Sequence, residues 1–99
     1  MNFTTTNDGG KVTIKFEGRL DTVTSPQLEE ALVPIIAETK DVAFDFAKLE
    51  YLSSAGLRVI LSAHKKLKAA GGRLTVANVN SVVKNVFDLT GFSSILNII

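Results

Sequence analysis

The chain has 99 residues, of which 45% are apolar and 21% are charged, and its formal net charge is +1. This length fits one domain, residues 1–99, and the composition excludes a disordered or collagen-like chain. Because charges of both signs are dispersed along the sequence, we expect no direct binding to nucleic acid and no electrostatic attraction to an anionic membrane.

The residue types that are missing exclude further kinds of function. The sequence has no cysteine and one histidine, which excludes disulfides, thiol nucleophiles and ordinary zinc sites, so we expect neither a metal nor a cofactor. No apolar stretch approaches the length of about 20 residues that spans a bilayer, and the polar N-terminus lacks the order of a signal peptide. We therefore expect a cytoplasmic protein that does not insert into a membrane.

The first predicted elements form a β-hairpin. A strand around residues 3–6 is followed by a turn at 7–10 that contains two consecutive glycines. The next strand has apolar residues that alternate with polar ones, namely Val12, Ile14 and Phe16. This alternation indicates a strand with one face in solvent, and residues 18–21 close it.

A first helix is predicted to begin at residues 24–26, where a capping residue is followed by a proline in the first turn. Its apolar residues keep helical spacing from Leu28 onward. Pro34 removes one internal hydrogen bond and clashes with the preceding turn. We therefore expect the helix to kink or to end near Val33.

The next unit is a buried strand followed by a helix. The apolar run Val42–Phe46 is typical of a strand that is buried on both faces, with Asp45 near its carboxyl end. A helix with regular apolar spacing follows Ser53 and Ser54 and stops at the glycine pair 71–72.

The remaining residues continue the alternation of strands and helices. They predict a strand over 73–77, a helix that is capped at 80 or 81 and ends at Gly91, and a last strand over 95–99. This order predicts an α/β fold, in which helices pack on a mixed, mostly parallel sheet of about five strands.

Candidate catalytic residues are few. His64 falls at helical spacing among apolar residues, which favours a side chain at the edge of a packed face over a general base. Asp21, Asp45 and Glu50 would be lone acids, because the sequence supplies no metal ligand set and no histidine partner for them. The sequence also contains no nucleophile elbow and no glycine-rich phosphate loop. We therefore expect a binding protein and not an enzyme.

Ser53 and Ser54 stand where a strand gives way to a helix, which is the usual location of ligand and partner sites in open α/β sheets. Either serine can also be a helix cap, because its hydroxyl can accept a hydrogen bond from an N–H two or three residues further on. On spacing alone the cap is favoured, and a functional role stays open.

Several segments resemble, in the right order, the successive motifs of the STAS domain family. They span nearly the whole chain and comprise residues 18–21, Asp45-Phe46, 52–61, 70–72 and 86–92. A chain that consists of little else resembles the stand-alone bacterial anti-sigma factor antagonists more than the STAS tails of anion transporters. The resemblance implies a STAS-type single domain that acts as an anti-sigma factor antagonist and controls sigma-dependent transcription.

The resemblance also implies the site residues. In these antagonists the phosphate acceptor is the serine two residues before the motif's glycine, which is Ser54 here. Members of the family usually carry aspartate directly before that serine, whereas this chain has Ser53. Asp21 and Asp45 match acidic or polar family positions beside the acceptor. The predicted partner-binding residues are Asp21, Asp45, Ser53, Ser54, Ala55, Gly56 and Leu57.

The partner implied by the resemblance is an anti-sigma factor that is itself a serine kinase and uses ATP, and a separate phosphatase would restore the serine. Unmodified Ser54 would lie in a flat apolar contact made by the exposed parts of Leu57 and its neighbours, and phosphorylation would release the partner. Two alternatives stay open. One is a STAS subunit of a membrane lipid-transport complex, and the other is a small-ligand-sensing module.

Overall fold

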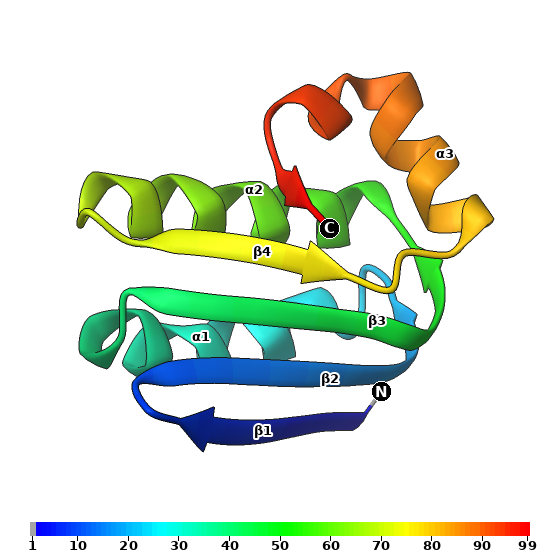
Figure 1. Cartoon of the computed structure of the whole chain (residues 1–99). Coiled ribbons are helices and arrows are strands. Elements are labelled where there is room, and N and C mark those ends of the chain that lie inside the picture. The colour runs from blue at the N-terminus through cyan, green and yellow to red at the C-terminus, as the bar shows by residue number, and fades with distance from the viewer. Residues whose placement is uncertain (1) are drawn as a thin grey trace.

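The computed structural model describes residues 2–99, in which strands and helices alternate (Figure 1). The elements are β1 (Asn2–Asp8), β2 (Lys11–Leu20), α1 (Ser25–Glu38), β3 (Asp41–Leu52), α2 (Ser54–Ala69), β4 (Arg73–Ala77), α3 (Ser81–Thr90), a short 3₁₀ turn (Phe92–Ser94) and β5 (Asn97–Ile98). The predicted fold class, an α/β fold with a five-stranded and mostly parallel sheet, is confirmed.

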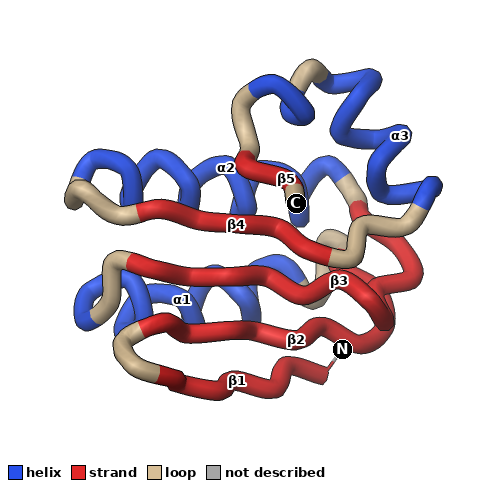
Figure 2. The backbone as a smooth tube through the Cα atoms, in the orientation of Figure 1, coloured by secondary structure: helices blue, strands red, loops and turns tan. Residues whose placement is uncertain are grey.

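The strands lie in the sheet in the same order as in the sequence, β1-β2-β3-β4-β5. Strand β1 is antiparallel to β2, and every later neighbour is parallel. Because each crossover between parallel strands is right-handed and advances in the same direction, consecutive helices fall on one face of the sheet. Helices α1 and α2 accordingly lie side by side behind the sheet, while α3 extends past the end of β3 (Figures 1 and 2).

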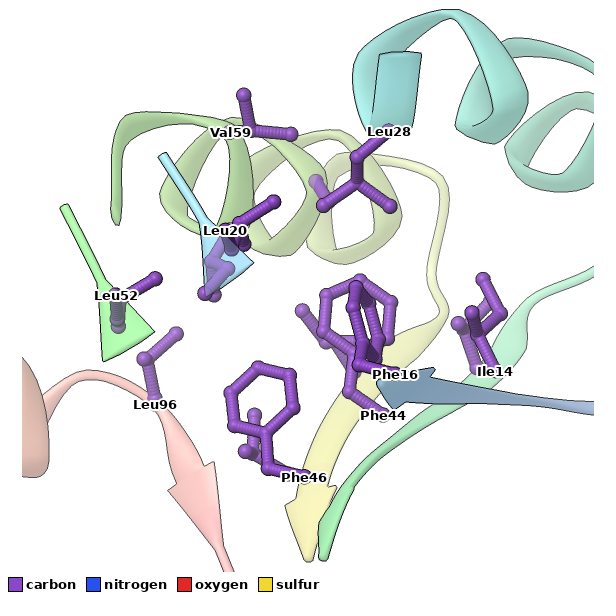
Figure 3. Close-up of a cluster of buried hydrophobic side chains, with 14 of the residues drawn as sticks. Ile14, Phe16, Leu20, Leu28, Phe44, Phe46, Leu52, Val59 and Leu96 are labelled. Carbon is purple, nitrogen blue, oxygen red and sulfur yellow. The ribbon is translucent and has the colours of Figure 1, made fainter. Parts of the chain in front are cut away.

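The core lies between the sheet and these two helices (Figure 3). Phe16 of β2 contacts Phe44 and Phe46 of β3 edge to face, with both pairs of ring centroids 5.0 Å apart. At the end of the core where the α2 helix begins, the side chains of Leu20 and Leu52 fill the space. Burial of these apolar side chains is the main term that stabilises the fold.

Helix α1 is continuous through Pro34 and ends at Glu38, so the expected early end near Val33 is wrong. The proline leaves the carbonyl of Glu30 without its helical N–H partner. Both Pro34 and Glu30 are exposed, so that carbonyl is open to solvent and the helix can continue.

Strand β3 is longer than predicted and continues to Leu52, which places Asp45 in its middle and not near its carboxyl end. The pairing with β2 contains two irregularities, and through them β3 carries extra residues. After Phe46 the buried residues are Leu49 and Leu52, at a spacing of three. A strand is identified by buried residues at every second position, and this alternation is lost after Phe46. The strand predicted from the sequence therefore ends too early.

Candidate functional site

Helix α2 begins where the two longest strands of the sheet end together. Leu20, the last residue of β2, pairs with Leu52, the last residue of β3, and the N–H of Ser53 donates to the Leu20 carbonyl at 2.9 Å. A Cβ atom on Gly56 would lie 2.8 Å from both the Leu20 Cγ and the Leu52 Cδ1 atoms. The close approach of α2 to the strand ends therefore depends on the missing side chain of this glycine.

The two serines at this helix start have different environments. The Ser53 hydroxyl caps α2 by accepting a hydrogen bond from the N–H of Gly56 at 3.3 Å. Ser54 is the first residue of the helix and is exposed, and within residues 2–99 its hydroxyl has no hydrogen-bond partner. Capping thus accounts for Ser53, whereas it does not account for Ser54.

The neighbouring loop, residues 21–24, is held by its own hydrogen bonds. The Asp21 carboxylate accepts from the N–H groups of Val23 and Thr24 at 3.0 Å each, and the Thr24 hydroxyl accepts from the Asp21 N–H at 2.9 Å. The bond from the Thr24 N–H is the main cause that keeps the pKa of Asp21 below its usual value. Asp21 is therefore an ionised residue that fixes the loop next to the α2 start.

Asp45 does not belong to this cluster. Its carboxylate accepts from the Asn78 amide at 2.9 Å and from the Ala47 N–H at 3.0 Å, and the Asn78 bond is the main cause that lowers its pKa. The extended segment 46–52 separates it from the α2 start. In the described chain no hydrogen bond or ion pair links it to residues 53–57. The expectation that Asp45 lies beside Ser54 is wrong, because the strand continues where a loop was expected.

Leu57 is only 4% exposed and Gly56 is buried as well, so the expected apolar contact surface made by Leu57 is also wrong. The exposed apolar side chains near the α2 start are Val23, at 75%, and Tyr51, at 39%. The Tyr51 ring is covered by the guanidinium of Arg19, 4.3 Å from its centroid. Sequence reasoning missed both residues. Val23 stands between Thr22 and Thr24, just after the end of β2, and Tyr51 directly precedes Leu52 at the end of β3, so their places in the sequence could have indicated them.

The first turn of α2 itself favours negative charge at Ser54. The first turn of α2 contains no acidic residue, and the unpaired N–H groups of a helix start carry partial positive charge. Arg58 lies one turn further along the same helix, is exposed, and has no ion-pair partner within the described residues. A phosphate on Ser54 would therefore be tolerated by the fold.

Within residues 2–99 no three His, Asp or Glu side chains are grouped to hold a metal ion. His64 is half-buried and lies ten residues after Ser54 on the same helix, which is about 15 Å at 1.5 Å per residue. In the described part of the chain no helix is both long and apolar enough to span a membrane.

The sequence is similar to those of known proteins. The family model of the STAS domain matches residues 2–99. The anti-sigma-B factor antagonist of Staphylococcus epidermidis is 34% identical over 86 residues, which cover 86% of this chain and 80% of the relative. The anti-sigma-B factor antagonist of Bacillus subtilis (strain 168) is 30% identical over 87 residues, which cover 88% of this chain and 80% of the relative.

A solved structure extends the comparison to the fold. The Bacillus cell fate determinant SpoIIAA in its phosphorylated form superposes with a TM-score of 0.79 at 21% identity, covering 99% of this chain and 91% of that chain. The chain belongs to the STAS domain family and, within it, to the anti-sigma factor antagonists, which are regulatory proteins and not enzymes.

Proposed function

We propose that this protein binds an anti-sigma factor while Ser54 is unmodified and releases it when Ser54 carries a phosphate, so that sigma-dependent transcription is controlled. The observation that carries the proposal is the exposed Ser54, whose hydroxyl has no hydrogen-bond partner within residues 2–99, whereas the Ser53 hydroxyl caps the helix. Relatives at 34% and 30% identity are named anti-sigma-B factor antagonists.

The contact surface is the start of α2 together with the loop at residues 21–24. Ser53 and Ser54 present the polar part of this surface, and Ala55 and the exposed side chain of Val23 present its apolar part. Gly56 and Leu57 are buried beneath this surface, where they set the position of the helix start. Asp21 holds the loop, and Asp45 lies in the middle of β3, outside the start of α2.

Release follows from local electrostatics. A phosphate adds about −1.5 to −2 charges, and a helix N-terminus stabilises negative charge by about 0.3–1 kcal/mol, so the free protein keeps its fold. At the interface the same phosphate loses its water and faces a surface shaped for a hydroxyl. A penalty of about 3 kcal/mol there weakens binding more than a hundredfold.

The partner of this site is an anti-sigma factor that is also the kinase for Ser54 and uses ATP, and a phosphatase returns the chain to its binding form. All of these steps take place in the cytoplasm. Ser53 replaces the aspartate of most family members, so the acceptor hydroxyl has no carboxylate directly before it. Asp21 directly follows Leu20, whose carbonyl accepts from the Ser53 N–H.

The test is phosphorylation by the cognate anti-sigma factor kinase and ATP, followed by mass spectrometry of the peptides. The wild-type chain is expected to gain one phosphate, on Ser54, and Ser54→Ala to gain none. Ser81→Ala is the matched control, because Ser81 is also an exposed first residue of a helix. A phosphate at another residue, or Ser54→Ala modified to the wild-type extent, would contradict the proposal.

A further inference from the structure

A trough runs between α1 and α2 and leads away from the α2 start. It consists of two adjoining hollows of about 430 and about 210 Å³, which share Glu29, Val59 and Ser62. The larger hollow reaches Thr22 of the loop 21–24 and Ala55, the residue directly after Ser54. The trough is therefore continuous with the proposed contact surface.

The floor of the trough is apolar. Leu32 of α1 and Val59 and Ala63 of α2 form it and are 2–7% exposed. Val33 stands on the rim at 61% exposure. On α2 the lining extends from residue 55 to residue 66, which is about three helical turns. This length accommodates the i, i+3, i+4 and i+7 side chains of a bound helix.

The two walls carry opposite charge. Helix α1 contains glutamates and no lysine or arginine, whereas α2 contains lysines and an arginine and no acidic residue. Glu29 lines the α1 wall, and Arg58 and Lys66 line the α2 wall. Within the described residues no ion pair joins the two helices. These charges are free to pair with a partner.

From the apolar floor, the opposed walls and the continuity with Ser54, we infer that the trough receives an amphipathic helix of the anti-sigma factor. The apolar stripe of that helix faces Val59, its basic side faces α1, and its acidic side faces α2. The inference rests on the proposed function and adds to it a second contact that does not involve the phosphate. The trough would then determine which anti-sigma factor binds, and phosphorylation of Ser54 would determine when that anti-sigma factor is released.

The test compares, by calorimetry, the affinity of the cognate anti-sigma factor for the wild-type chain and for three variants. Ser62→Trp fills the middle of the trough and is expected to raise Kd at least tenfold. Lys65→Trp is the matched control on the same helix, because Lys65 is exposed and lies outside the trough, and it is expected to change Kd less than twofold. Glu29→Lys, an exposed charge reversal, is expected to weaken binding and does not depend on fitting a new side chain into the trough.

Chemical-shift mapping of the wild-type chain gives an independent readout. Addition of the anti-sigma factor is expected to shift amide signals in residues 29–37 and 58–66. Wild-type affinity of both Ser62→Trp and Glu29→Lys, or shifts confined to the α2 start, would overturn the trough and leave the proposed function standing. A wild-type chain that binds no anti-sigma factor would overturn both.

Discussion

The starts of α2 and α3 share the same local chemistry. In each, a polar residue before the helix accepts a hydrogen bond from an N–H three residues on, at 3.3 Å for Ser53 and at 2.8 Å for Asn80. In each, the first helical residue is an exposed serine, Ser54 or Ser81. A helix cap followed by a serine therefore does not distinguish a functional site from a structural one.

The surroundings of the two starts differ. The third residue of α2 is Gly56, whose missing side chain lets the helix lie close to the paired ends of β2 and β3. The third residue of α3 is Val83, which has a buried side chain. Arg58 of α2 has no ion-pair partner in the described chain, whereas Lys84 of α3 contacts Asp88 at 3.4 Å. Placement at the strand ends and an unpaired charge, and not the cap, therefore distinguish the α2 start from the α3 start.

The largest expected effect separates the two serines in binding. Ser54→Asp is expected to weaken the complex with the anti-sigma factor by about 3 kcal/mol, which is more than a hundredfold in Kd. Ser81→Asp, the same change at the α3 start, is expected to alter Kd less than twofold. Calorimetric titration of both variants checks this, and equal effects at the two positions would remove the distinction between the helix starts.

The next effect concerns the close packing under α2. Gly56→Ala is expected to destabilise the fold by about 1–3 kcal/mol, because its Cβ would overlap the Leu20 and Leu52 side chains. In an uncrowded helix the same substitution stabilises by about 0.5–1 kcal/mol, so the sign of the change is diagnostic. Urea unfolding measures it. A more stable Gly56→Ala would mean that the helix start does not need the close approach.

A smaller effect separates the two caps. Ser53→Ala is expected to cost about 0.5–1 kcal/mol, because its capping bond is long. Asn80→Ala is expected to cost about 2 kcal/mol, because the Asn80 amide also donates to the Leu49 carbonyl at 2.8 Å. Thermal unfolding of the two variants side by side checks this order. A larger loss of stability from Ser53→Ala than from Asn80→Ala would contradict it.

The smallest effect tests the position of Asp45, which is bonded to the loop that leads into α3. Its pKa in the folded state lies below the ordinary value, mainly through Asn78, so its contribution to stability is present above the unfolded pKa and is lost as pH falls through the folded one. Asn78→Ala is expected to raise this pKa and to destabilise more at pH 7 than at pH 3. Carboxyl NMR titration and urea unfolding measure both, and an unchanged pKa would contradict the contact.

Much of the fold could be predicted from the sequence, because regular apolar spacing and glycine stops mark the β1–β2 hairpin, α2, β4 and α3. The later half of β3 could not, since its buried residues come every third position and not every second. The path of α1 through Pro34 depends on the exposed side of the helix, which the sequence pattern does not reveal.

The site could be predicted only in part. The serine pair at a strand-to-helix junction was visible, and the motif resemblance pointed to Ser54. Which serine caps the helix depends on backbone geometry, and the burial of Leu57 depends on how α2 rests on Leu20 and Leu52. For the same reason Val23 was missed, because its exposure arises from the hydrogen-bonded loop 21–24.

The most direct test of the proposed switch is the affinity of the cognate anti-sigma factor for the chain phosphorylated on Ser54, measured beside the unmodified chain at one ionic strength. We expect a Kd more than a hundredfold higher for the phosphorylated chain, with both forms unfolding at nearly the same temperature. Equal affinity of the two forms, or release that accompanies unfolding of the phosphorylated chain, would contradict it.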